Sequence, residues 1–237
     1  MTDPMNKKNV LRLVLLCLMF VAGLTMKTMA KRSSAIIPAV RESESQDVNT
    51  MEKKRIAITF DDGPNPNYTE DLLKGLKKRG VKATFFLLGS QVEEYPEIVE
   101  DIHEDGHLIG VHSYDHVNFG QIGDAQALKQ VEKTQQVIYR VTGEYPDFIR
   151  PPYGCWKKEL DDQIPMIEVL WDVDPCDWAT TDADTVVQRI LSQVKDGSII
   201  LLHDASKSSV SAAFTVIDVL QEQGYEFVTV EELILGY

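Results

Sequence analysis

Seven short apolar runs alternate with helical patterns along most of this chain, and this alternation restricts the possible folds more than any other feature. The runs are rich in β-branched and aromatic residues and cover residues 55–60, 83–88, 107–111, 148–150, 167–171, 198–202 and 227–230. Helical periodicity covers residues 68–79, 96–105, 124–141, 184–195 and 210–223. Strands that alternate with helices form a parallel sheet covered by helices. The pattern predicts an α/β fold, and it leaves a closed barrel and an open doubly wound sheet as alternatives.

Ionisable side chains stand at or just after the carboxyl ends of five of these runs. They are, in chain order, Asp61 and Asp62 after the first run, His112 after the third, Arg150 at the end of the fourth, Asp174 after the fifth and His203 after the sixth. The carboxyl ends of parallel strands meet at one edge of the sheet, and that edge holds the ligands and catalytic groups of such folds. We therefore expect these side chains to share one site.

Four of the five histidines form two pairs with i, i+4 spacing. His103 and His107 belong to the sequence HEDGH, which has the H-E-x-x-H pattern of zinc proteases. A protease site needs both histidines on one helix face, whereas Gly106 is a helix stop signal between them and His107 begins the next apolar run. We therefore expect this pair to be structural, with His107 hydrogen-bonded at the start of a strand.

The second pair, His112 and His116, follows a predicted strand and is a candidate metal site. An i, i+4 spacing on a single turn brings both imidazoles to one side, and neutral imidazoles suit zinc or a similar divalent ion. One member of the pair Asp61 and Asp62 would complete a set of two histidines and one carboxylate, with positions left for water. The other aspartate would be free to act as a base.

The charge balance of the chain excludes one class of partner. Lys and Arg number 24 against 37 Asp and Glu, which gives a formal net charge of −13. A surface of this sign repels nucleic acid, so we expect no nucleic-acid partner. It suits a neutral or cationic substrate better, although an excess of acidic residues often serves solubility alone.

The first 53 residues are predicted to precede the folded domain. Two lysines come before an apolar stretch that ends near residue 24, and TMA at 28–30 offers a signal-peptidase site. An uncleaved membrane anchor is the alternative, although Arg12 interrupts the stretch and a spanning helix prefers roughly 20 apolar residues. The predicted organisation is a signal peptide or membrane anchor at 1–30, a flexible linker at 31–53 and an exported domain at 54–237.

Five short motifs occur in a fixed order and resemble those of a known family. They are TFDDGP at 59–64, HSYDH at 112–116, RPPYG at 150–154, DPCDW at 174–178 and LLHD at 201–204. Together they are similar to the motifs of the polysaccharide deacetylases with a NodB-homology domain, carbohydrate esterase family 4, over about residues 54–236. The resemblance implies a distorted (β/α) barrel with about seven parallel strands, in agreement with the number of apolar runs.

The resemblance also implies a metal centre and a base. Asp62, His112 and His116 would bind a divalent metal, usually Zn²⁺. Asp61 would be the general base, and Arg150 would hold and tune it.

The remaining roles that the resemblance implies concern the acyl group and the leaving group. The backbone N–H of Tyr153 would help to bind the oxyanion. His203 would be the general acid, oriented by Asp174. Trp178 and Leu201 would line the pocket for the acetyl methyl, with core packing as the alternative for these two side chains.

These roles imply metal-dependent hydrolytic N-deacetylation of an N-acetylglucosamine-type polysaccharide with release of acetate. We expect peptidoglycan as the substrate and a monomer outside the cell or at the outer face of the cytoplasmic membrane, held there by the N-terminal segment if it is not cleaved. The alternatives are a chitooligosaccharide deacetylase, an acetylxylan O-esterase and a sugar-binding envelope protein without activity. Phosphoryl transfer, which also uses paired aspartates, would leave His112, His116 and His203 without roles.

Two cysteines, Cys155 and Cys176, lie inside or beside the third and fourth motifs. Both motifs converge on one site in the family that the chain resembles, and an exported domain meets oxidising conditions. A Cys155–Cys176 disulfide and two free thiols are the alternatives.

Overall fold

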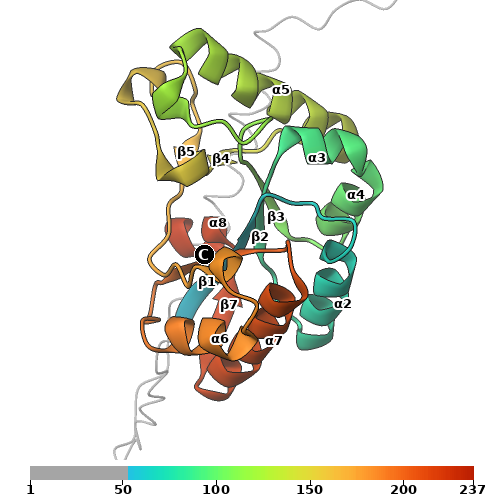
Figure 1. Cartoon of the computed structure of the whole chain (residues 1–237), viewed down its shortest axis with the longest axis vertical. Helices are drawn as coiled ribbons and strands as arrows, with labels where there is room; N and C mark the ends of the chain where they lie inside the picture. Colours follow the sequence, from blue (N-terminus) through green and yellow to red (C-terminus); the bar gives the residue numbers. More distant parts are fainter. Residues whose placement is uncertain (1–52) are drawn as a thin grey trace, which may run out of the picture. The chain divides into compact units, whose positions relative to one another are not determined.

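The computed structural model describes residues 53–237, where seven parallel strands form one sheet. The predicted targeting segment, and all but the last residue of the predicted linker, lie outside the described residues. The strands are β1 (Lys54–Asp61), β2 (Thr84–Leu87), β3 (Leu108–Val111), β4 (Phe148–Ile149), β5 (Ile167–Glu168), β6 (Ile199–His203) and β7 (Tyr225–Val228). Their order is β5-β4-β3-β2-β1-β6, and β7 pairs with the first half of β1. The α/β fold with a parallel sheet is confirmed (Figure 1).

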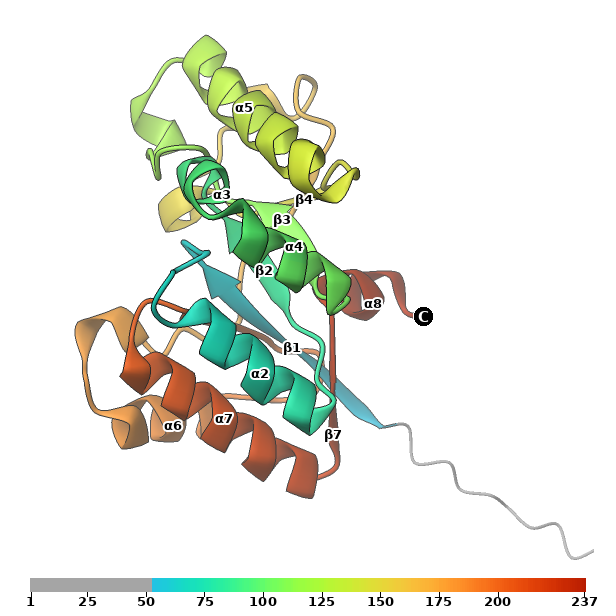
Figure 2. The same cartoon turned by 90° about the vertical axis from the view of Figure 1, so that its right-hand side faces the viewer.

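Helices cover the outer face of this sheet, except the last one, whose buried Val230 packs with side chains of the inner face, and every predicted helix is present. The helices are α2 (Thr69–Arg79), α3 (Gly89–Glu94), α4 (Pro96–Glu104), α5 (Asp124–Thr142), α6 (Ala183–Leu191), α7 (Lys207–Glu222) and α8 (Val230–Leu235). Figure 2 shows α2 beside α7, and α4 beside α5. The sequence pattern missed α3 and α8, because six residues are too few for a helical period to stand out. In the part of the chain that the structure describes, no helix has the length and apolarity that a membrane crossing requires.

The fifth strand is shorter than predicted, and the chain after it leads from β4 to β6. Only Ile167 and Glu168 pair with β4, whereas the predicted strand ran from 167 to 171. The carbonyls of Val169 and Leu170 accept hydrogen bonds from the Arg150 side chain at 3.0 and 3.1 Å. The chain then turns, and Val173 forms an isolated parallel bridge to β6. The result is a distorted barrel in which one broken strand joins β4 to β6.

Alternation along β1 separates the helix-covered core from the barrel interior. Ile56, Ile58 and Phe60 are buried in the large core cluster with the helices. Ala57 lies in a second cluster with interior side chains such as Phe86. Because successive residues of a strand point to opposite faces, Asp61 at the end of β1 belongs to the interior set. The backbone register pairs Asp61 with His203 of β6.

His107 has the structural role that the sequence predicts. Its Nδ1 accepts a hydrogen bond from the N–H of Ala83 at 3.0 Å, and its buried ring lies edge-on to Phe85. Burial lowers the pKa of this imidazole to about 4, and the charge of nearby Lys82 acts in the same direction. His107 is therefore neutral in the folded protein at pH values where an exposed histidine becomes charged.

Replacing His107 with asparagine should weaken the acid sensitivity of the fold. The unfolded imidazole binds a proton near pH 6.5 and the folded one only near pH 4, so the unfolded state binds more protons between these values and stability falls as the pH is lowered from 6.5 to 4. The asparagine amide oxygen can accept the Ala83 hydrogen bond and does not titrate. We expect the drop in unfolding free energy between pH 7 and pH 4 to be smaller in His107→Asn, by up to about 3 kcal/mol.

Urea denaturation at both pH values, with EDTA present to remove metal linkage, measures this difference. His103→Asn, at a half-buried position on α4, is the control and should keep the wild-type pH dependence. An equal drop in unfolding free energy between pH 7 and pH 4 in wild type and His107→Asn would show that His107 does not control acid stability.

Candidate active site

A cleft of about 1110 Å³ opens at the carboxyl ends of the strands. Nine of the ten predicted site residues line it, and they are Asp61, Asp62, His112, His116, Tyr153, Asp174, Trp178, Leu201 and His203. The tenth, Arg150, is fully buried in the barrel interior. The side chains that the sequence places at separate strand ends therefore do meet in one site.

Asp62, His112 and His116 form a cluster of candidate ligands that fits a divalent metal, and we call these three side chains the metal cluster. Asp62 Oδ1 lies 3.4 Å from His112 Nε2 and 3.3 Å from His116 Nε2, and the three candidate ligand atoms all lie within 4.8 Å of one another. Ligands bound tetrahedrally at about 2.0–2.1 Å from a zinc ion would be roughly 3.3–3.4 Å apart. Asp62 Oδ1 is also buried without a hydrogen-bond partner, which is costly unless a cation occupies the site.

The backbone of Asp62 explains how two adjacent aspartates face the same cleft. In a continuing strand, Asp61 and Asp62 would point to opposite faces. Asp62 instead lies just after the end of β1 and has a φ of 71°, in the left-handed region. This conformation is strained for a residue with a Cβ, and such strain concentrates at functional sites.

His112 is held in the tautomer that a metal ligand needs. Its Nδ1 donates to the carbonyl of Arg150 at 2.7 Å, which leaves the Nε2 lone pair directed at Asp62. Burial lowers the pKa of His112 and outweighs the opposite effect of Asp61 and Asp62. The ring is therefore neutral and able to coordinate.

Arg150 fixes the carboxylate of Asp61 from inside the barrel. Its Nη1 donates to Asp61 Oδ1 at 2.7 Å and to Thr59 Oγ1 at 2.6 Å. With the two bonds to the carbonyls that break the fifth strand, the guanidinium satisfies four acceptors. The second oxygen, Asp61 Oδ2, lies 3.9 Å from His112 Nε2, on the side of the metal cluster. One oxygen is thus held and the other is free to accept a proton.

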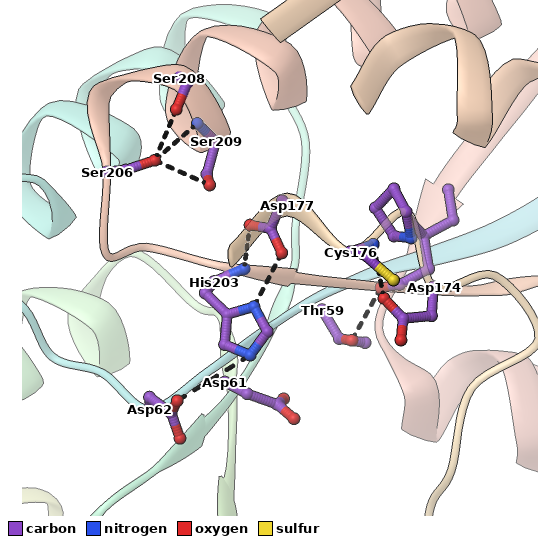
Figure 3. A network of polar contacts seen from close by, with 12 residues as sticks. Thr59, Asp61, Asp62, Asp174, Cys176, Asp177, His203, Ser206, Ser208 and Ser209 are labelled. Atoms are coloured by element: carbon purple, nitrogen blue, oxygen red, sulfur yellow. Dashed lines mark hydrogen bonds and ion pairs between the residues drawn. The ribbon is translucent and has the colours of Figure 1, made fainter. Parts of the chain in front are cut away.

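The residue that orients His203 is Asp177, and the prediction of Asp174 is wrong. His203 Nδ1 lies 2.8 Å from Asp177 Oδ1, and the backbone N–H of His203 donates to Asp177 Oδ2 at 2.9 Å. Asp174 lies away from the imidazole, on the side of Cys176, and its Oδ1 accepts a hydrogen bond from the backbone N–H of Cys176 at 2.7 Å (Figure 3). The left-handed conformation of Cys176, with a φ of 49°, turns the chain so that the second aspartate of DPCDW faces β6.

The environment of His203 favours its protonated form. Burial alone would lower its pKa, but the hydrogen bond and charge of Asp177, with smaller contributions from Asp61 and Asp62, outweigh this and raise the pKa to about 9. Burial alone would raise the pKa of Asp177, but its hydrogen bond with His203 and the charge of that residue outweigh burial and lower the pKa. His203 Nε2 lies 3.9 Å from Asp62 Oδ2, so the proton it carries faces the metal cluster across the cleft.

Tyr153, which was predicted to bind the oxyanion through its backbone N–H, lies beside His116. Tyr153 has a φ of 61°, and its ring lies edge-on to His116 at 4.8 Å. The N–H groups of Gly154 and Cys155 donate to the carbonyls of Pro151 and Pro152, and no such bond engages the Tyr153 N–H within residues 53–237. Tyr153 thus presents a free donor near the metal cluster, as an oxyanion site requires.

Leu201 and Trp178 both line the cleft, but only Leu201 is buried. Leu201 is 5% exposed and Trp178 is 71% exposed. The alternative of core packing therefore fails for Trp178, which offers an open aromatic face at the rim. Of the two alternatives for Cys155 and Cys176, the structure has both as free thiols.

Two further residues, Thr59 and Asp177, contribute to the site without a role predicted from the sequence. Thr59 is a buried polar residue within β1 that accepts from Arg150 and donates to the carbonyl of Ile200 at 2.8 Å. Its polarity in an otherwise apolar run was the available signal. Asp177 carried no signal that separates it from Asp174, because both are aspartates of the same motif.

Comparison with known proteins agrees with this arrangement. A family model described as polysaccharide deacetylase matches residues 48–165. The match ends before the segments that hold Asp177 and His203, so the roles of these two residues are inferred from the geometry described above.

Curated relatives and a solved structure cover more of the chain. The peptidoglycan-N-acetylmuramic acid deacetylase PdaC of Bacillus subtilis is 44% identical over 181 residues, which are 76% of this chain and 39% of that protein. A peptidoglycan-N-acetylglucosamine deacetylase of Bacillus cereus is 38% identical over 76% of this chain and 68% of its own length. The structure of peptidoglycan deacetylase PdaC from Bacillus subtilis has a TM-score of 0.75 at 44% identity and covers 77% of this chain and 90% of that one. The chain spans about two fifths of the length of several curated relatives.

Proposed function

This chain belongs to the polysaccharide deacetylase family, and on that premise we propose that it is a metal-dependent hydrolase that removes N-acetyl groups from peptidoglycan. The observation that carries the proposal is the convergence of three elements on one cleft. A metal cluster at Asp62 lies beside a carboxylate held by Arg150 and opposite an imidazolium held by Asp177. Amide hydrolysis needs these parts, namely an activated water, a stabilised oxyanion and a proton for the leaving amine.

The charge of the cleft supports an uncharged acetamido sugar as the substrate. Four aspartates and three histidines line it, whereas no lysine or arginine does among the described residues. A divalent metal at Asp62, the Arg150 guanidinium beside Asp61 and the protonated His203 would together balance the four aspartates, so the site suits the neutral acetamido group. The printed names of the relatives above, which act on peptidoglycan sugars, support the choice of polymer.

The chain's own residues account for each proton transfer. Asp61 accepts a proton from the attacking water through the oxygen that Arg150 does not hold. The Tyr153 N–H donates to the carbonyl oxygen as negative charge develops on it. His203 then donates its Nε2 proton to the departing amine, and Asp177 stabilises the imidazolium beforehand. Zn²⁺, held by Asp62, His112 and His116, would supply Lewis-acid polarisation and lower the pKa of water.

We also propose that the chain acts outside the cytoplasmic membrane. Support comes from the basic and apolar character of residues 1–30, which is typical of an export signal or anchor. Cell fractionation with mass measurement of the N-terminus tests this proposal. Recovery in the cytoplasm would contradict it.

Acetate release is the direct test of the activity. We expect release from peptidoglycan and from N-acetylglucosamine oligomers, loss of that release with EDTA, and recovery on addition of Zn²⁺. Release from acetylxylan alone would point to an O-esterase instead. Release that persists after complete removal of metal would contradict the proposed mechanism.

Asp177→Asn should lower kcat by at least about 100-fold, because the amide cannot stabilise the imidazolium of His203. Asp174→Asn is the matched control in the same motif and should lower kcat by less than about tenfold, since Asp174 contacts Cys176 and not His203. Zinc content should be unchanged in both. Steady-state kinetics at saturating substrate make the comparison. A larger loss of kcat in Asp174→Asn than in Asp177→Asn would show that Asp174 orients His203.

A further inference from the structure

We propose that Gln130, on α5, is a positioning residue for the metal site, because it holds the loop that carries His116. The inference rests on the metal-binding part of the proposed function. Gln130 lies outside all five motifs and does not line the cleft. Its side chain reaches the site from the helix layer and acts through the HSYDH loop.

Both the oxygen and the nitrogen of the Gln130 amide bind this loop. Its Oε1 accepts hydrogen bonds from the backbone N–H groups of Tyr114 at 2.8 Å and Asp115 at 2.9 Å. Its Nε2 donates to Asp115 Oδ2 at 2.9 Å. One side chain thus supplies partners to two consecutive backbone groups and to a carboxylate, which fixes its own orientation as well.

The loop needs such support because its backbone is strained. Ser113 and His116 both have positive φ values, 64° and 55°. Residues with a Cβ adopt this conformation only where surrounding contacts hold them in it. On the opposite side, the N–H groups of Gly89 and Ser90 donate to the carbonyls of Ser113 and Tyr114 at 3.0 and 3.1 Å. The loop is therefore held between α3, through its carbonyls, and Gln130, through its N–H groups.

Gln130 acts on His116 more than on His112. His112 is fixed by the sheet, because its N–H donates to the carbonyl of Leu87 at 2.9 Å and its ring donates to Arg150. No hydrogen bond reaches Nδ1 of His116 within residues 53–237, so this ring takes its position from the loop backbone and from its contact with Tyr153. Loosening the loop would therefore displace His116, which is one of the three proposed metal ligands.

Zn²⁺ affinity of the full chain, measured by competition with a chromogenic chelator, tests the inference without reference to catalysis. Gln130→Ala should weaken Zn²⁺ binding by about 10- to 100-fold, the range seen when groups that orient metal ligands are removed. Gln136→Ala is the control, because Gln136 is exposed on the same helix and should leave affinity unchanged. Thermal melting in EDTA checks that the variants remain folded.

A charge swap gives a test that general destabilisation cannot imitate. Gln130→Glu keeps an acceptor for the loop N–H groups but sets its carboxylate against that of Asp115, so affinity should fall. Adding Asp115→Asn to this variant restores a donor–acceptor pair and should return affinity to within about threefold of wild type. Asp115→Asn alone should have little effect, since its amide oxygen can accept the same bond.

The outcomes separate this inference from the proposed function. Wild-type affinity in Gln130→Ala, or no recovery in the double variant, would overturn the role of Gln130 while the metal site stands. Failure of the wild-type chain to bind Zn²⁺ would overturn both.

Discussion

Asp61→Asn should reduce acetate release by about 10³-fold while Zn²⁺ affinity stays within about tenfold of wild type. The asparagine oxygen can accept the Arg150 hydrogen bond in place of Asp61 Oδ1, so the local structure should persist. The amide cannot accept a proton from water, and no other described carboxylate is held by Arg150 beside the metal cluster. The loss should therefore appear in kcat, with metal content unchanged.

Kinetics and zinc titration on the same preparations provide the measurement. Asp62→Asn is the informative comparison, because the adjacent carboxylate belongs to the metal cluster and its loss should weaken Zn²⁺ binding. Near-normal turnover in Asp61→Asn would show that another group removes the proton. Loss of zinc in that variant would instead place Asp61 among the ligands.

His112→Ala should weaken Zn²⁺ binding by more than about 100-fold and abolish acetate release. The imidazole is buried and already directed at Asp62 through its hydrogen bond to Arg150, so its removal takes away the most rigidly held ligand. His103→Ala, from the H-E-x-x-H sequence, should bind Zn²⁺ as wild type does. This pair of variants separates the two readings of the histidine-rich segment.

Competition titration again measures affinity, and melting in EDTA reports the cost of removing a buried ring. A variant that melts normally in EDTA and fails to bind Zn²⁺ has lost the site and not the fold. Retention of zinc by His112→Ala together with its loss from His103→Ala would reverse the assignment made from the structure.

The sequence was sufficient for the fold class, which follows from periodicity, and for the strand-end positions of several site residues, whereas the roles of those residues came from the resemblance to the family. Most strands of the parallel sheet are buried on both faces and read as apolar runs, with β5 as the exception, and ionisable residues follow the ends of several runs. Asp61, His112 and His203 could be placed at one edge of the sheet by this reasoning alone. The helix stop at Gly106 likewise separated the structural histidines from the metal cluster.

Other features depend on contacts that no local pattern contains. The choice between Asp174 and Asp177 is made by a left-handed turn at Cys176, a residue type that does not predict such a turn. The break in the fifth strand is made by the Arg150 guanidinium, which takes carbonyls that a regular strand would pair with a neighbour. Gln130 is recognisable only once α5 is seen against the HSYDH loop.

The register between β1 and β6 has a consequence for how this enzyme family can diversify. Asp61 and His203, the proposed base and acid, stand directly opposite each other on adjacent strands, so main-chain hydrogen bonds of the sheet set their separation. A slip of one residue would turn one of them to the wrong face, which makes the spacing resistant to gradual change. Insertions and substitutions in the rim loops leave that spacing intact, and new polymers can be recruited by rebuilding the rim around an unaltered reaction centre.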